Sequence, residues 1–386
     1  MQTQPETRPV RVAGSEPAWA LWDEKCARTP WTIGIEEEVM LLSPDDWALA
    51  PRIDTVLEAI DESLADHVGA ETHGSALELR TGVHTNVSAG IAELHRLRRS
   101  LVDQLRPLGL RAAAAGLHPF AVWQDTEISS GARYQALHGS MRELARREPT
   151  FALHVHVALP GRAAAIRALN QMRAHVPLLL ALSANSPYWQ GRDTGLASAR
   201  TPLFQGFPRV GIPREFADYA DYTESIDLLL RCDAFPEPTY LWWDVRLQPR
   251  FATIELRIMD AQTQLERCAG LVALVQSLVR LEVIEGFARS ILVGAPEVLA
   301  ENRFLAARDG VEAELIDPVA GRRVPVRELL GATLAACRPH AQDLGCEAEL
   351  AGLGAILARP DTAWQREAAA GPAGLPGLVE ALAAAF

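Results

Sequence analysis

The sequence predicts an α+β fold, in which an antiparallel β-sheet packs its apolar face on helices and lines a polar cavity with its other face. Five stretches between residues 32 and 260 alternate apolar and polar side chains, which is the period of a half-buried strand. Apolar residues at helical spacing lie between the strands and dominate from about residue 263 to 386. Strands that each present one apolar and one charged face are typical of an antiparallel sheet covered on one side.

The 386-residue chain has room for one large domain or two ordinary ones, but no repeat, low-complexity tract or linker divides it. We therefore expect a single domain at residues 29–386, whose C-terminal part (about 263–386) is helical. Residues 1–28 are polar, carry prolines and show no periodicity, so we expect a flexible leader there.

The charged residues exclude some classes of partner. A formal net charge of -12 argues against a nucleic-acid binder or a protein of anionic membranes. Lys25 is the only lysine, so phosphate or carboxylate groups would have to be recognised by arginine side chains.

The cysteines and apolar runs indicate a cytoplasmic protein. Five scattered cysteines without a CxxC pair are typical of free thiols in a reducing compartment. The N-terminus has no apolar signal segment, and the apolar run at 176–182 is too short to cross a bilayer.

The first strand, at residues 32–42, carries an unusual acidic pair. Its apolar residues fall on one face, whereas Glu36 and Glu38 fall on the other. Two neighbouring carboxylates are costly to bury unless a cation balances them. A solvated edge strand would give the same pattern, so the other strands must decide. Glu37 points to the apolar face, where we expect an arginine or water to satisfy it.

Four later strands repeat the pattern of polar side chains opposite an apolar face. The polar residues are Glu78 in 75–81, His154 and His156 in 151–159, Asp244 and Arg246 in 241–247, and Glu255 and Arg257 in 252–260. Two histidines on one face of an apolar strand favour ligands or phosphate contacts over a structural role. We therefore expect a charged wall rather than a wet edge.

A long loop at residues 184–213 is dense in glycine, proline, arginine and aromatic residues. Such a loop is typical of a lid or a binding loop, and Arg192 and Arg200 would suit carboxylate or phosphate groups. A solvated connector is the alternative, although the aromatic residues of the loop need burial.

Several carboxylates with histidine favour Mg²⁺ or Mn²⁺ bound by oxygen ligands rather than zinc. Arginines on the same wall point to a polyphosphate and to phosphoryl transfer. The sequence has neither a P-loop nor a Gly-x-Gly-x-x-Gly turn, so neither of those nucleotide sites applies.

Eight motifs follow one another along the chain. They are Gly34-Ile35-Glu36-Glu37-Glu38, Glu78-Leu79-Arg80-Thr81, Gly116-Leu117-His118-Pro119-Phe120, His154-Val155-His156-Val157, Asn185-Ser186-Pro187, Gly191-Arg192-Asp193-Thr194-Gly195, Trp242-Trp243-Asp244-Val245-Arg246 and Thr253-Ile254-Glu255-Leu256-Arg257-Ile258-Met259-Asp260. With these motifs in this order, the chain resembles the carboxylate–amine ligase family, also called glutamate–cysteine ligase type 2, over about residues 30–370.

The resemblance implies a glutamine-synthetase-like catalytic fold with a curved antiparallel sheet, and ATP- and Mg²⁺-dependent amide formation through an acyl phosphate. The implied metal ligands are Glu36, Glu38, Glu78, His156 and Glu255. The implied catalytic residues are Arg257, Glu36 and Glu255, and the implied nucleotide contacts are His154 and Arg257. The implied substrate contacts are Asn185, Arg192, Arg200 and Arg246.

The leading hypothesis from the resemblance is a ligase that joins the γ-carboxyl of glutamate to cysteine or another amine. Departures from the family pattern at Ala199, Leu247 and Gln248 put the amine in doubt. One alternative is the same chemistry on another acid and amine; the other is a metal-dependent hydrolase or nucleotide-binding protein. The expected partners are small molecules, without nucleic acid or membrane, and a homodimer is the assembly considered.

Two glutamate substitutions in the charged wall should separate activity from folding. Glu36→Gln and Glu255→Gln should each abolish activity and leave folding intact or improved, because each removes an unpaired like charge from the site.

Overall fold

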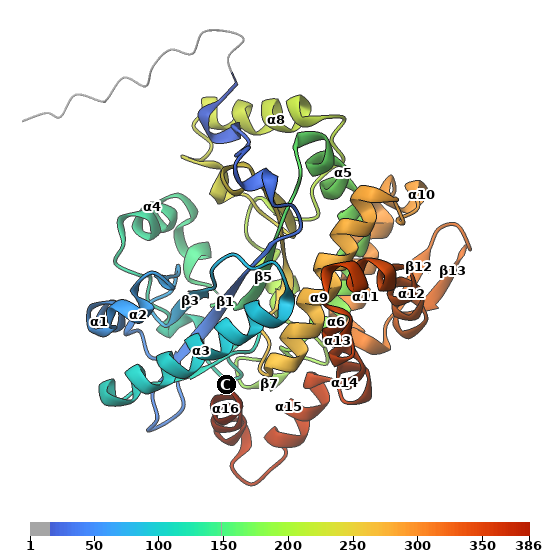
Figure 1. Cartoon of the computed structure of the whole chain (residues 1–386). Coiled ribbons are helices and arrows are strands. Elements are labelled where there is room, and N and C mark those ends of the chain that lie inside the picture. Colours follow the sequence, from blue (N-terminus) through green and yellow to red (C-terminus); the bar gives the residue numbers. More distant parts are fainter. Residues whose placement is uncertain (1–15, 148) are drawn as a thin grey trace, which may run out of the picture.

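The computed structural model describes residues 16–147 and 149–386 (Figure 1). Within this part of the chain, seven strands form one antiparallel sheet in the order β10-β11-β5-β1-β3-β2, with β4 paired to the end of β1. The strands are β1 (Ile33–Leu42), β2 (Val68–Ala70), β3 (Ala76–Arg80), β4 (Arg111–Ala113), β5 (Ala152–Ala158), β10 (Val245–Gln248) and β11 (Thr253–Asp260).

Helices cover the apolar face of this sheet. α3 (Val87–Leu105) contacts β1, β3 and β4, and α9 (Leu265–Ile284) packs on β5 and on α3 (Figure 1). α5 (Arg162–Met172) and α6 (Val176–Ser183) contact β11. α9 is buried on almost every side, which explains why most of its residues are apolar.

On the opposite face, the C-terminal helix covers one end. α16 (Gly374–Ala385) contacts β4, and its Leu378 and Leu382 share an apolar cluster with Met40 and Leu42 of β1. The C-terminal helix therefore closes the apolar end of β1 and leaves the Glu36–Glu38 end to line cavities.

Several boundaries differ from the sequence expectation. Residues 54–65 show apolar side chains at the spacing of one helix but form two, because Asp61 interrupts them and caps the second helix by accepting a bond from Ser63 N (3.0 Å). A hairpin of β12 (Glu314–Asp317) and β13 (Arg322–Pro325) lies within the C-terminal part that was expected to be helical. The remaining elements are α1 (Ile53–Ala59), α2 (Glu62–Ala65), α4 (Ala132–Met141), β6 (Tyr188–Trp189), β7 (Arg192–Asp193), α7 (Arg200–Phe204), β8 (Val210–Gly211), α8 (Tyr219–Arg231), β9 (Trp242–Trp243), α10 (Ser290–Val293), α11 (Pro296–Asp309), β12 (Glu314–Asp317), β13 (Arg322–Pro325), α12 (Val326–Leu344), α13 (Glu347–Leu350), α14 (Gly352–Ala358) and α15 (Asp361–Ala369).

The expected flexible leader is wrong for residues 16–28. Two short 3₁₀ turns, Ala18–Ala20 and Cys26–Arg28, lie there, and the Trp22 side chain is buried with its ring 5.9 Å from that of Tyr219 in α8. Burial of large aromatic surface holds this segment to the body of the protein. Residues 1–15 of the expected leader lie outside the described residues.

Glu37 confirms the expectation of an arginine partner on the apolar face. The carboxylate is fully buried and makes a two-pronged ion pair with Arg98 of α3, whose Nε lies 2.8 Å from Glu37 Oε2. The guanidinium also donates to the carbonyls of Gln262 and Thr263 (2.6 and 2.8 Å). This pair fixes α3 and the start of α9 to the central strand.

All five cysteines are free thiols, and Cys268, Cys337 and Cys346 are buried. In the described ranges, every helix is too short or too polar to cross a bilayer.

Candidate active site

Strand register gathers the polar residues of five neighbouring strands on one face of the sheet. The pairs in register are Glu36 with His154, Glu38 with Glu78, and Glu255 with both His156 and Arg246. We call these residues, together with Arg257, the polar wall. The expectation of one charged wall across β3, β1, β5, β11 and β10 is met by their side-chain contacts.

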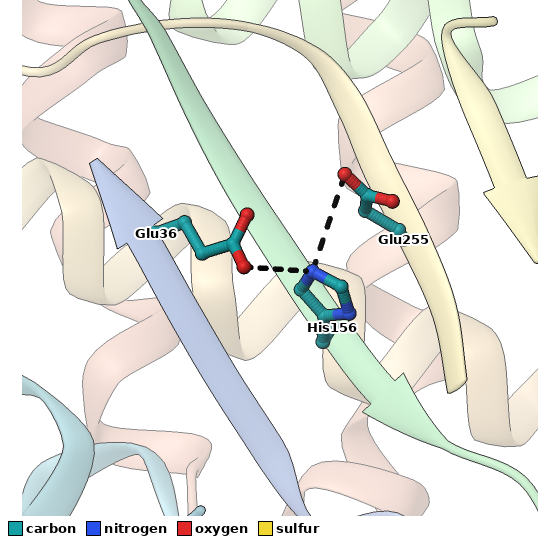
Figure 2. A group of neighbouring side chains, drawn as sticks. All are labelled: Glu36, His156 and Glu255. Atoms are coloured by element: carbon teal, nitrogen blue, oxygen red, sulfur yellow. Dashed lines mark ion pairs between the residues drawn. The ribbon is translucent and has the colours of Figure 1, made fainter. Parts of the chain in front are cut away.

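Glu36, His156 and Glu255 form the first group that could hold a cation. Figure 2 shows the three side chains reaching toward one another from neighbouring strands. His156 Nε2 lies 3.4 Å from Glu36 Oε1 and 4.0 Å from Glu255 Oε1. Its other nitrogen, Nδ1, lies 3.0 Å from Thr253 Oγ1. Nε2 is buried and has no hydrogen-bond partner among the described residues. A buried, unsatisfied imidazole nitrogen between two carboxylates suits a divalent cation.

Glu36, Glu78 and His154 form a second group that shares Glu36 with the first. Their ligand atoms all lie within 4.8 Å of one another. His154 Nδ1 is 3.5 Å from Glu36 Oε2, and His154 Nε2 is 3.8 Å from Glu38 Oε1. The structure therefore places His154, expected at the nucleotide, as close to the carboxylates as His156.

The carboxyl groups of the polar wall have pKa values shifted in opposite directions. Burial and the neighbouring Glu36 and Glu71 carboxylates raise the pKa of Glu78 well above its usual value. Burial and Glu71 raise the pKa of Glu38 to about 8. Burial also opposes the charge of Glu36, but His156 and a hydrogen bond from His154 outweigh it and lower the pKa. Carboxylates held protonated by like charge would ionise on binding a cation.

Glu255 lies among cations, which corrects the expectation that it carries unpaired charge. Arg246 Nε donates to Glu255 Oε2 (2.9 Å) and Arg246 Nη2 to Oε1 (3.1 Å). Arg257 pairs with Oε1, and Gln248 Nε2 donates to Oε2 (2.8 Å). Although burial opposes ionisation, the two arginines hold the pKa of Glu255 well below its usual value.

Two cavities flank the polar wall. The first, of about 70 Å³, is lined by Glu38, Arg257 and aromatic side chains such as Phe204 and Trp242. The second, of about 310 Å³, is lined by Glu36, His156, Gly34, Thr253 and Phe251, among others. A molecule in the first cavity would meet Glu38 and Arg257 of the wall, and one in the second would meet Glu36 and His156.

Comparison with known proteins decides the family. The model of the family described as glutamate-cysteine ligase family 2 matches residues 32–366. The chain belongs to this family. A putative glutamate–cysteine ligase 2-1 of Rubrobacter xylanophilus is 39% identical over 332 residues, covering 85% of this chain and 87% of the relative. A putative glutamate–cysteine ligase 2 of Sorangium cellulosum is 36% identical over 330 residues, covering 85% and 88%. The resemblance drawn from the motifs is confirmed, and the protein is an amide-forming ligase.

Solved structures confirm the fold class of this glutamate–cysteine ligase family 2 member. A glutamate–cysteine ligase of Francisella tularensis, in complex with AMP, superposes with a TM-score of 0.65 at 12% identity, covering 92% of this chain and 87% of that chain. A bifunctional glutathione synthetase of Pasteurella multocida superposes with a TM-score of 0.68 at 15% identity. The match covers 94% of this chain and about half (54%) of that longer chain.

Two of the expected substrate contacts in this family member are occupied by protein groups. Asn185 is fully buried; its Nδ2 donates to Ala261 O (2.9 Å), and its Oδ1 accepts from Gln365 Nε2 (2.6 Å). Arg246 donates to the carbonyls of Leu241 (2.8 Å) and Thr239 (3.1 Å) besides Glu255. Both side chains are therefore held by protein groups, and direct substrate contact through them stays a prediction.

The two loop arginines differ from each other. Arg200 is buried, donates to Ile258 O (3.0 Å) and lines a small cavity with Arg257. Arg192 is exposed in the β6–β7 hairpin and has no ion pair within the described residues. The structure thus brings Arg200 to the vicinity of the wall and leaves Arg192 on the surface.

Glu71 is a site residue that the sequence did not reveal. It lines the first cavity with Glu38 and Arg257, and burial raises its own pKa. It follows β2, which has only three residues and so shows too little alternation to be recognised as a strand. A glutamate four residues before the predicted strand at 75–81 was the only available signal.

Proposed function

We propose that the protein is an ATP- and Mg²⁺-dependent carboxylate–amine ligase that joins the γ-carboxyl of glutamate to cysteine or another amine. The observation that carries the proposal is the unsatisfied His156 Nε2 between Glu36 and Glu255, beside the guanidinium of Arg257. Family membership supports the ligase class, and the relatives' names supply the two substrates.

The donor set fits Mg²⁺ or Mn²⁺. Two overlapping groups offer mainly carboxylate oxygens with one imidazole each, which is hard-cation chemistry. Glu36, Glu78, Glu255, His156 and His154 are the side chains that would hold such ions, with Glu38 beside them. When bound, divalent cations would neutralise the phosphate charges of the nucleotide.

The side chains of the polar wall would position the substrates and stabilise the charge of the transferred phosphoryl group. Glu255 pairs with Arg257 and holds its guanidinium where it can contact that group. In the first step, a glutamate carboxylate oxygen attacks the γ-phosphorus, the bond to ADP breaks and an acyl phosphate forms. In the second, the amine nitrogen attacks the acyl carbon, loses a proton and displaces phosphate.

The two cavities support two directions of approach. The larger cavity, beside Glu36 and His156, and the smaller one, beside Glu38 and Arg257, meet the wall through different residues. A nucleotide and an acid substrate entering separately would meet at the wall, as in-line phosphoryl transfer requires.

ADP release tests the proposal. We expect ADP to form only when ATP, Mg²⁺, glutamate and an amine are all present, and we expect the amide product by mass spectrometry. Substituting other acids and amines one at a time would identify the pair. Glutamate-independent ATP hydrolysis, or hydrolysis of a metal-dependent substrate without ATP, would refute the ligase mechanism. A cytoplasmic location and a homodimer stay predictions.

A further inference from the structure

A cavity of about 320 Å³ lies apart from the two that flank the polar wall and shares no lining residue with either. It is bounded by α11, by the segment around β8 and by the turn after α5. Three arginines and several apolar side chains line it. They include Arg173, Arg214, Arg303, Ile212, Pro213 and Leu299.

Arg173 is the unusual member of this lining. Its side chain is 3% exposed, and its Nε and Nη1 have no hydrogen-bond partner in the described part of the chain. Burial lowers the pKa of Arg173, while the exposed Glu215 carboxylate raises it from outside ion-pair distance. A buried guanidinium without a partner is costly, and one beside an open cavity is suited to an anion.

The other two arginines are already neutralised. Arg214 Nη2 lies 2.6 Å from Asp221 Oδ1, and Arg303 Nε lies 2.6 Å from Asp244 Oδ2. These pairs hold two guanidinium groups at the cavity without cancelling Arg173. The cavity is thus lined by two arginines held in ion pairs and by one that has no ion-pair partner within the part of the chain that the structure describes.

We propose that this cavity is a second binding site, separate from the polar wall, for a small molecule that carries a carboxylate or phosphate group. Arg173 would take the anionic group with its guanidinium, whose planar N–H donors match the oxygen spacing of either group. Ile212, Pro213 and Leu299 would cover a short carbon body.

Backbone hydrogen bonds connect this cavity to Arg257 of the polar wall. Gly211 lines the cavity, and its carbonyl accepts from Asp244 N (2.9 Å). The Asp244 carbonyl in turn accepts from Arg257 N (2.8 Å). An anion at Arg173 would therefore bind two hydrogen bonds away from the backbone of the catalytic arginine.

Thermal unfolding without ATP and Mg²⁺ tests the site with sulfate, phosphate and glutarate as probes, against chloride at equal ionic strength. For the wild type we expect a saturable rise of about 3 °C at a hundredfold excess over Kd. Phosphate and glutarate distinguish a phosphate-bearing from a carboxylate-bearing ligand, and a saturable, Arg173-dependent response to either supports the proposal.

The variants locate the response. Arg173→Met should unfold at a higher temperature than the wild type in chloride, because the unpaired cation is gone, and should lose the saturable rise. Arg173→Gln is a second variant that keeps the side chain polar. Arg167→Met, an exposed arginine of the preceding helix α5, should respond as the wild type does. An unchanged response in both Arg173 variants, or its loss in Arg257→Met, would overturn the proposal.

Discussion

Single carboxylates on the polar wall differ in what balances their charge. Glu255 is surrounded by Arg246, Arg257 and Gln248, whereas Glu78 faces other carboxylates and only Arg80, 3.6 Å away, offsets them. A change from glutamate to glutamine removes the charge and keeps the shape. The same change should therefore have opposite effects on stability at the two positions.

Glu78→Gln should stabilise the metal-free protein and reduce its activity. We expect the free energy of unfolding at pH 8 to rise by about 1 kcal/mol, because a disfavoured charge is removed. Activity should fall at least about 100-fold through loss of a cation ligand. Glu255→Gln, the matched change, should lose both activity and stability. Urea unfolding without Mg²⁺ and ADP release give the two readouts, and a stabilised Glu255→Gln would contradict the assigned arginine contacts.

Arg257 should not tolerate replacement by lysine. Its guanidinium pairs with Glu255 and lies 3.4 Å from His154 Nδ1, so it presents several donors in one plane. A lysine ammonium is a point charge and cannot hold Glu255 and a phosphoryl oxygen together. We expect kcat to fall at least roughly 100-fold with nearly unchanged unfolding temperature. Steady-state ADP release measures this, and near-normal turnover would remove Arg257 from the mechanism.

At the scale of elements, the ion pair of Glu37 and Arg98 joins β1 to α3. Both side chains are at most 1% exposed. Glu37 lies between Glu36 and Glu38 in β1 and points to the opposite face of the sheet. Removing one partner leaves a buried charge without compensation. The pair thus supports the strand that carries the first two site residues.

Arg98→Met should lower the free energy of unfolding by about 3–5 kcal/mol. Arg96→Met, two residues away on the exposed side of α3, should change it by less than about 0.5 kcal/mol. The double variant Glu37→Gln/Arg98→Met should recover part of the loss, because no buried charge then remains. Urea unfolding of the wild type, Glu37→Gln, Arg98→Met and the double variant gives the coupling energy. Additive effects of Glu37 and Arg98 would show that the pair is not coupled.

The elements also show what the sequence can reveal. β1, β3, β5 and β11 were predictable because helices cover one face and leave alternate side chains polar. The packing of α16 on Met40 could not be predicted, because a contact between residues about 340 positions apart leaves no local pattern in the sequence. The role of Asn185 could not be read from the sequence for a related reason: a polar residue in a loop looks the same whether it meets a substrate or a buried Gln365.

For the whole molecule, long-range polar contacts outside the site make stability depend on pH. His118 joins the turn after β4 to the segment after β1: its Nε2 donates to Trp47 O (2.8 Å) and its Nδ1 accepts from Ala121 N (2.9 Å). This pattern needs a neutral ring with its proton on Nε2. Burial lowers the pKa of His118 to about 4, because the charged form would lose solvation.

This contribution should be lost on acidification. The folded pKa of about 4 lies below the unfolded value of 6.5, so the stabilisation is complete above pH 6.5 and disappears as the pH falls through 4. Between pH 7 and 4.5 the loss from His118 should be about 2–3 kcal/mol. Urea unfolding at the two pH values should show a difference smaller by that amount in His118→Gln, and an unchanged difference in the exposed control His95→Gln. The buried His73, whose pKa burial also lowers to about 4, should keep part of the acid sensitivity in His118→Gln. If His118→Gln retains the full wild-type difference, His118 is already charged in the folded protein, and its bond from Ala121 N cannot exist as described.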